Sequence, residues 1–339
     1  MTGCKLGAYP SNQNIRYTHG ENDMSEPGIT GDALMRRGLK LTHLRLLAQI
    51  SETGHLGLAA ARLGVTQPAA SRLLAEVEQI VGQKVHERSG RGIWLLPAGE
   101  ALARRAQRVQ IEMAEAEREL ETIRGGGLGH VRIGAVTAPA LELVLPALRA
   151  ARIAHPSLTV EVEVLPSAEL CALLLAGKLD VVLCRLPEGK DRQLLDMRPI
   201  GSEPVALIVR RDHRLTTSPA VTLADLKDYD WVMPSAASPI GRAVGQRLSA
   251  LGLDLGQVRV TTSSFLFTLA LLRSSNAIAP LARAVADRFA VGENAAFAML
   301  PVDLDIVVPD FGLVTRRGTE PAPPAARMIA LILAQSVAA

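Results

Sequence analysis

Gln67, Ser71 and Arg72 are the residues of this 339-residue sequence whose types and spacing best fit a chemical task. They lie within a predicted helix whose apolar residues recur at spacings of four, three and four: Ala70, Leu74, Val77 and Val81. On a helical wheel the three polar residues fall opposite that apolar stripe, so an amide, a hydroxyl and a guanidinium face outward. Such groups can hydrogen-bond the base edges and phosphates of duplex DNA, and the pattern therefore predicts a DNA-reading helix.

Two further features position this helix. Gly64 separates it from a shorter segment with Leu58 and Leu63 on its apolar face, so the chain is predicted to run helix, tight turn, helix. Thr66 can accept a hydrogen bond from the first turn, and Pro68 falls where a missing N–H group costs nothing. A glycine-centred helix pair also occurs in many soluble proteins that never bind DNA, so this pattern alone leaves both interpretations open.

Positive charge is concentrated around the helix pair. From Arg36 to Arg91 there are nine Lys or Arg residues against four acidic residues, whereas the whole chain has a net charge of only +3. Phosphate binding requires such a local surplus. The segment contains no Phe, Tyr or Trp before Trp94, so it lacks the stacking surface that single-stranded nucleic acid needs. The segment therefore favours double-stranded DNA as its partner.

A predicted β-wing follows the helix pair. Residues 84–88 and 93–95 form two short extended runs on either side of a glycine-rich turn at 89–92. Arg91 is placed at the tip of the wing and Arg88 at its base, where arginine can enter a narrow minor groove or hold a phosphate. The predicted DNA-binding residues are Thr66, Gln67, Pro68, Ser71, Arg72, Arg88 and Arg91.

The next segment, residues 98–124, carries a heptad pattern. Apolar residues alternate four and three positions apart across three heptads, and most charged residues lie off that seam. A helix of this length needs a partner, and the seam predicts that two chains pair through Leu102, Val109, Met113, Ala116 and Leu120. The alternative is a helix packed on its own domain, which the polar residues on both sides of the stripe disfavour.

Glycines at 125, 126, 127 and 129 end this helix and predict a flexible hinge over residues 125–130. Beyond it, extended runs at 131–136, 159–164 and 181–184 alternate with helical patterns at 139–154 and 169–176. A second such set follows between residues 206 and 279, before a strand at 311–315 and a final helix. The alternation predicts an α/β domain with parallel sheets and two lobes that the chain crosses twice.

The sequence is similar to the LysR-type transcriptional regulators over nearly everything after about residue 40. The segments TQPAASR and VHERSGRGIWLLPAGE resemble the family's recognition helix, wing and linker-helix start, in the family's order and spacing. The resemblance implies a mainly α winged helix-turn-helix (39–97), a dimerisation linker helix (98–124) and a two-lobed α/β effector domain similar to periplasmic binding proteins (131–339). Lobe I would comprise residues 131–204 and 305–339, and lobe II residues 205–304. Residues 1–38 precede the family's usual start and are predicted to be a disordered extension.

Three departures from the family pattern lie near the predicted DNA interface. Gly57 and Leu58 stand where a hydroxyl and a basic residue are usual, so some phosphate contacts are predicted to be missing. His86 replaces the usual wing phenylalanine, and Leu96 replaces the usual threonine cap of the linker helix.

Small ligands of α/β sheets bind where strands end and helices begin. That rule selects Thr137, Ala138, Ser167, Arg185, Ser238 and Ser264, and Phe265 is expected to form an apolar wall. The family resemblance supports Thr137, Ala138 and Ser167 most, because their positions match the family's effector cleft. Hydroxyls and backbone N–H groups suit a sugar, a sugar acid or another carboxylate, and the second lobe resembles a LysR subgroup associated with sugar-related effectors. The alternative, and the commoner role for a single Ser or Thr at such a place, is an ordinary helix cap. Arg185 could bind an anionic ligand or pair with Asp180 or Glu188.

The sequence argues against an enzyme, a metal site and a cofactor. It has no GxSxG, P-loop or HExxH motif and no GxGxxG at a strand-to-helix turn, and its cysteines and histidines lack metal-ligand spacing. It has no apolar run of membrane-spanning length and no signal-peptide core, so a cytoplasmic location is expected. The expected partners are double-stranded DNA, a small-molecule effector, further copies in a homodimer or homotetramer, and RNA polymerase. Two rivals are a transporter's solute-binding protein and an α/β enzyme fused to a helix-turn-helix.

Overall fold

The computed structural model of the chain describes residues 33–89, 92–125, 129–218, 220–252, 258–292, 294–302 and 304–338. The chain divides into two compact units, residues 1–108 and 109–339, and the boundary falls within helix α5 (Pro97–Gly125). Residues 1–32 of the predicted extension, Arg91 of the predicted wing and residues 126–128 of the predicted hinge lie outside the described residues.

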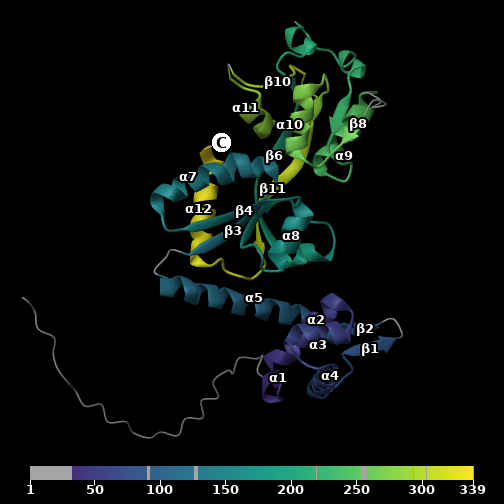
Figure 1. The fold of residues 1–339 in the computed structure, drawn as a ribbon, viewed down its shortest axis with the longest axis vertical. Helices are drawn as coiled ribbons and strands as arrows, with labels where there is room; N and C mark the ends of the chain where they lie inside the picture. The colour runs from purple at the N-terminus through teal and green to yellow at the C-terminus, as the bar shows by residue number, and fades with distance from the viewer. Residues whose placement is uncertain are drawn as a thin grey trace, which may run out of the picture. The chain divides into compact units, whose positions relative to one another are not determined.

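The first unit is a helical domain with a two-stranded wing (Figure 1). Its elements are α1 (Ala33–Arg36), α2 (Leu41–Thr53), α3 (Leu56–Leu63), α4 (Gln67–Val81), β1 (His86–Ser89), β2 (Gly92–Leu95) and the first part of α5. Side chains from α2, α3, α4, β2 and α5 share one core, in which Leu46, Leu47, Leu74 and Val77 are fully buried. This unit confirms the predicted helix-turn-helix architecture.

Gly64 makes the tight turn between α3 and α4. Its backbone adopts the left-handed conformation, with a φ of 72°, and its N–H group donates to the carbonyl oxygens of Ala60 and Ala61. A residue with a side chain would be strained at this φ, which explains why glycine ends the helix here.

Part of the predicted N-terminal extension is helical. Helix α1 lies within residues 1–38, and its Leu34 packs against the buried cluster of Leu39, Leu44, Ala48 and Ala106. The prediction of disorder up to residue 38 is therefore wrong for this helix, because Leu34 packs on a buried apolar cluster that includes the distant residue Ala106.

The second unit is an α/β domain around a seven-stranded sheet. The strands, in spatial order, are β10 (Phe297–Met299), β6 (Leu195–Arg210), β11 (Val307–Arg316), β5 (Val181–Cys184), β3 (His130–Ala135) and β4 (Thr159–Val164), with β9 (Ala279–Ala282) also paired to β6. A separate sheet contains β7 (Trp231–Met233) and β8 (Val258–Thr261). The helices are α6 (Thr137–Pro139), α7 (Leu145–Ala154), α8 (Ser167–Leu175), α9 (Pro239–Ala250), α10 (Phe265–Ser274), α11 (Arg283–Phe289) and α12 (Pro323–Ala338), with a π-helical turn η1 (Ala140–Val144) and 3₁₀ turns η2 (Lys190–Leu194), η3 (Arg214–Thr217) and η4 (Asp225–Asp228).

We refer to the part built on β3, β4 and β5 as lobe I and to the part that contains β7, β8, β9 and β10 as lobe II. In lobe I, α7 and α12 cover one face of the sheet and α8 covers the other (Figure 1). Strand β3 pairs in parallel with β4 and β5, and β7 pairs in parallel with β8, as the βαβ alternation predicts. The pairs that β6 forms with β9, β10 and β11, and that β11 forms with β5, are antiparallel. The sheet is therefore mixed: the parallel pairing predicted for the runs at 131–136, 159–164 and 181–184 is confirmed, and β6 and β11 add antiparallel pairs to it.

Strands β6 and β11 connect the lobes. Residues 195–204 of β6 pair with β11, whereas residues 205–210 pair with β9 and β10 of lobe II. Gly312 lies at an irregular point of the first pairing, and a Cβ atom there would come within 2.4 Å of the Arg198 carbonyl oxygen. Only glycine permits this close approach of β6 and β11, which we call the crossing strands because they run from one lobe to the other.

Among the described residues, no helix is both long enough and apolar enough to cross a membrane. Within the same residues, no three His, Cys, Asp or Glu side chains are grouped so that they could hold a metal ion.

Candidate DNA interface and effector site

Helix α4 presents the predicted reading residues at its N-terminal end. The Thr66 hydroxyl accepts a hydrogen bond from the Ala69 N–H group at 3.4 Å, and the proline lies in the first turn. Gln67 and Arg72 are exposed, whereas Ala70 and Leu74 are buried in the core of the first unit. The helix therefore has the buried stripe and the opposite polar face that its sequence predicts.

The wing is held against α4 by two polar contacts. The Arg88 guanidinium donates to the Ser71 hydroxyl at 3.0 Å, which joins two of the predicted DNA-binding residues. The Glu78 carboxylate accepts a hydrogen bond from the Val85 N–H group at 3.0 Å. His86 Nδ1 lies 3.1 Å from the same carboxylate, without the alignment of a hydrogen bond. Helix and wing thus form one surface, and Glu78, which the sequence analysis missed, helps to fix it.

The predicted dimerisation seam of α5 divides between two environments. Leu102 is half-buried in the core of the first unit, and Ala106, the next seam position, is fully buried there. Val109, Met113 and Leu120 are 38%, 50% and 55% exposed. Leu102 therefore packs within its own chain instead of facing a second chain, and the exposed apolar face of α5 begins at Val109.

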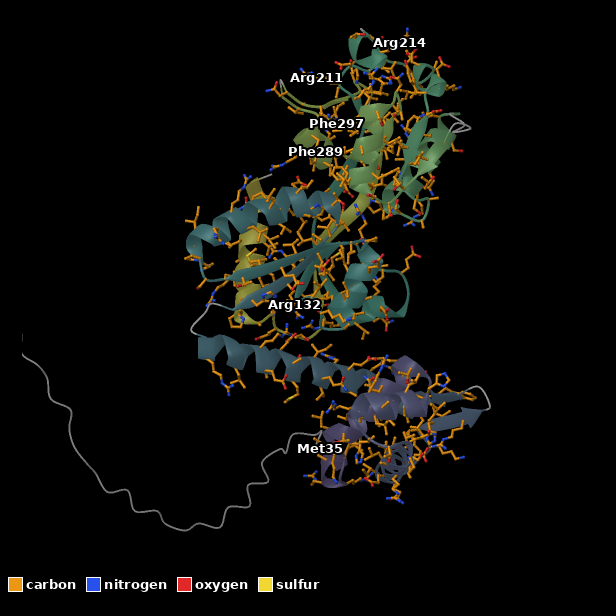
Figure 2. All side chains as sticks on the ribbon, in the orientation of Figure 1. Met35, Arg132, Arg211, Arg214, Phe289 and Phe297 are labelled. Atoms are coloured by element: carbon orange, nitrogen blue, oxygen red, sulfur yellow. The ribbon has the colours of Figure 1, made fainter. Side chains whose placement is uncertain are left out.

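The two lobes meet in an apolar cluster. Ala138 of lobe I is buried together with Ala282 and Val285 of lobe II, and Phe265 packs against them. The ring of Phe265 lies 5.4 Å, centroid to centroid, from the ring of Phe289, which is labelled in Figure 2. The structure thus brings together two of the predicted effector residues, Ala138 and Phe265, in what we call the interlobe cluster.

Three predicted effector hydroxyls also have structural roles. Ser238 accepts a hydrogen bond from the Gly241 N–H group at 3.0 Å, and Ser264 accepts one from the Phe267 N–H group at 3.2 Å. Ser167 begins α8 and accepts from the Arg185 N–H group at 3.3 Å. Ser238 and Ser264 are therefore helix caps, the alternative interpretation that their sequence positions allow.

Arg185 is bound to the crossing strands. Its Nη2 lies 2.6 Å from Glu203 Oε2 on β6, and its Nε donates to the Pro309 carbonyl oxygen of β11 at 2.7 Å. The side chains of Arg185 and Glu203 are only 13% and 6% exposed. The two partners expected from sequence proximity, Asp180 and Glu188, are wrong, because the fold brings Glu203 to this arginine instead.

The surroundings of this ion pair are acidic. Burial raises the pKa of Glu142, on the turn η1, and the carboxylates of Glu203 and Asp287 raise it further. Glu142 therefore keeps its proton to a higher pH than an ordinary glutamic acid does.

Two family models match the chain and together cover most of it. One, described as LysR substrate binding domain, matches residues 124–336, and the other, described as bacterial regulatory helix-turn-helix protein, lysR family, matches residues 41–100. The HTH-type transcriptional regulator GbpR of Rhizobium radiobacter is 41% identical over 260 residues, which cover 76% of this chain and 86% of GbpR. The HTH-type transcriptional regulator PcaQ of Agrobacterium fabrum is 30% identical over 289 residues, which cover 84% of this chain and 91% of PcaQ.

Solved structures share the fold. Full-length CbnR in complex with its target DNA has a TM-score of 0.54 at 22% identity, covering 88% of this chain and 100% of CbnR. Full-length OxyR from Pseudomonas aeruginosa has a TM-score of 0.56 at 20% identity, covering 88% of this chain and 94% of OxyR. The family resemblance of the sequence is thus confirmed. The chain belongs to the LysR family of bacterial transcriptional regulators, with a helix-turn-helix DNA-binding domain followed by a LysR substrate-binding domain, and it is not an enzyme.

Proposed function

We propose that this regulator reads duplex DNA with Gln67, Ser71 and Arg72 of α4, while Arg88 and Arg91 of the wing hold the backbone. The observation that carries this proposal is the exposed polar face at the N-terminal end of α4, continued onto the wing by the 3.0 Å contact between Arg88 and Ser71. Side chains at the start of such a helix reach base edges in the major groove. The likeness to CbnR, whose structure includes its target DNA, extends to the fold alone.

The assembly that we propose is a homodimer, or a dimer of dimers, held through Val109, Met113, Ala116 and Leu120 of α5. These residues form one exposed apolar face of the helix. A dimer carries two reading helices, so its operator is expected to contain two half-sites related by two-fold symmetry. RNA polymerase is then the partner through which DNA binding would change transcription.

The effector that we propose is an uncharged, hydroxyl-rich molecule such as a sugar, bound where the lobes meet. Ala138 and Phe265 would provide an apolar wall, and Thr137 and Ser167 would provide hydroxyls beside it. A sugar acid or another carboxylate is less favourable, because the guanidinium of Arg185 is already paired with Glu203. A ligand held between lobes acts by its different affinity for two arrangements of them.

The effector proposal predicts a specific loss on replacing Ser167→Leu. The purified full chain is heated with glucose, galactose, glucuronate or benzoate, and the unfolding midpoint of the effector unit is measured. A neutral sugar at one hundred times its dissociation constant should raise the midpoint by about 5–10 °C in wild type and not in Ser167→Leu. Ser249→Leu, at an exposed position of α9, is the matched control and should respond like wild type. A response to the acids alone would contradict the uncharged effector, and a full response of Ser167→Leu would contradict the site.

A further inference from the structure

The second half of α5 binds to lobe I of its own chain. Ile111, Glu115 and Arg118 lie four and three residues apart and so share one face of the helix. All three are less exposed than the apolar face formed by Val109 and Met113. One face of this part of the linker helix, with Ile111, Glu115 and Arg118, therefore lies toward lobe I, and another, with Val109 and Met113, is exposed to solvent.

An ion network joins the first face to lobe I. Glu115 pairs with Arg316 at the end of β11, whose guanidinium also donates to the carbonyl oxygens of Leu174 at 3.1 Å and Leu179 at 3.2 Å. The side chains of Arg316 and Glu115 are 10% and 17% exposed. Because both charges are largely removed from water and each is paired, loss of either partner leaves the other uncompensated.

Asp180 forms the second part of this network. Its Oδ1 lies 3.4 Å from Arg118 Nη1 and 2.7 Å from Nη2 of Arg132, a β3 residue labelled in Figure 2. Arg132 also donates to the Gly177 carbonyl oxygen at 2.9 Å. One carboxylate of lobe I thus binds an arginine of the linker helix and an arginine of the sheet together.

An apolar contact adjoins these ion pairs. Gly177, in the turn after α8, has a φ of 68°, and a Cβ atom there would lie 2.8 Å from both Cγ atoms of Ile111. The absence of a side chain at 177 allows Ile111 to lie directly against the turn. A charge network and a close apolar contact therefore hold the same helical segment.

We infer that residues 109–118 of the linker helix are a fixed part of lobe I, attached within one chain, and stay attached when the operator is bound. Lobe I would then carry the outward face of Val109 and Met113 with it, so a movement of that lobe changes the dimer seam directly. The attachment itself is independent of the proposed function, and only its effect on the dimer rests on that proposal. Glu115, Arg118, Asp180 and Arg316 are positioning residues in this scheme.

The attachment is tested by a disulfide between Ile111→Cys and Gly177→Cys, in a chain that also carries Cys4→Ser and Cys184→Ala, because the sulfur atoms of Cys171 and Cys184 lie 3.5 Å apart and could otherwise form an intramolecular disulfide of their own. The Cβ position at 177 lies 3.3 Å from Ile111 Cβ, close to the separation of about 3.5–4.5 Å that disulfides span. Oxidation should give a cross-linked species of monomer mass on a non-reducing gel, with operator affinity within about twofold of the reduced protein. Each single cysteine variant is the control and should form no such species.

Three results would overturn the inference. Because a side chain at residue 177 is strained at a φ of 68°, the unfolding midpoint of the double-cysteine chain is measured first, and no cross-link in a chain that keeps the wild-type midpoint would show that the segment is not held on lobe I. A cross-link of dimer mass, when chains carrying one substitution each are mixed, would show that the helix binds its partner's lobe. An intramolecular cross-link that lowers operator affinity more than tenfold would show that the segment must leave lobe I to bind DNA.

Hydrogen exchange gives a second measurement that needs neither DNA nor effector. In Glu115→Gln the amides of residues 109–118 should exchange at least about tenfold faster than in wild type, since a charge-assisted hydrogen bond is lost. Glu112→Gln, at an exposed position one residue from Ile111, should leave exchange unchanged. Equal exchange in both variants and wild type would contradict the role of Glu115 even if the cross-link forms.

Discussion

Met113→Glu should dissociate the dimer and lower operator affinity by more than about a hundredfold. Met113 is half-exposed in the single chain, and in the proposed dimer it is covered by the same face of a second helix. A carboxylate placed there loses its water without gaining a partner, at a cost of several kcal/mol. The two helix-turn-helix domains would then bind DNA independently, and the increase in operator affinity that comes from linking them in a dimer would be lost. Sedimentation velocity at micromolar protein and a titration with operator DNA measure the two effects.

Ala114→Glu is the matched control for this variant. It introduces the same charge one residue away, at an exposed position that lies off the apolar face. Dimer mass and operator affinity should stay at their wild-type values. If Met113→Glu also sediments as wild type, the exposed face of α5 is not the dimer interface.

Replacing Arg185→Met should destabilise the effector unit by about 3–5 kcal/mol, because it leaves the Glu203 carboxylate buried without its partner. The substitution also removes the hydrogen bond to Pro309, so the contact with both crossing strands is lost. Urea unfolding reports this loss through Trp231, buried in lobe II, in a chain whose exposed Trp94 is replaced by Phe. We expect a lower urea midpoint with an unchanged dependence of the unfolding free energy on urea concentration.

Two further variants test whether the loss of stability comes from the ion pair with Glu203. Arg192→Met, at an exposed position of η2, should change stability by less than about 0.5 kcal/mol. The double variant Arg185→Met with Glu203→Leu should recover part of the loss, since no buried charge then remains alone. Equal losses for Arg185→Met and Arg192→Met would show that the pair with Glu203 adds nothing to stability.

The sequence predicts the DNA-binding unit better than the effector unit. Helix α4, its cap at Thr66 and the turn at Gly64 all follow from local spacing, because a helix repeats its buried face every three or four residues. The exposed reading face follows from the same spacing. The burial of Leu102 in the core of its own unit could not be predicted in this way. A heptad pattern shows which face of a helix is apolar, but it does not show whether the same chain or a second chain covers that face.

The crossing strand β6 shows what local pattern cannot predict. Its first part contains Pro199, Gly201 and Pro204, which normally argue against a strand, and only its second part is predicted as extended. These residues are tolerated because β6 pairs with β11 through an irregular register, more than one hundred residues further along the chain. The pairing of Arg185 with Glu203 depends on that register, so no spacing in the sequence could have revealed it.

The most direct test of DNA reading by α4 compares Gln67→Ala with Gln79→Ala, two exposed glutamines at opposite ends of the helix. DNA fragments selected from a random pool by the wild-type chain are titrated with each protein at fixed salt. Because we propose that Gln67 contacts a base edge, its loss should cost about 1–3 kcal/mol, or roughly 5- to 150-fold in affinity, on selected fragments and little on random DNA. Gln79→Ala should bind as wild type does. Wild-type affinity and unchanged base preference for Gln67→Ala would contradict the claim that this helix reads the operator.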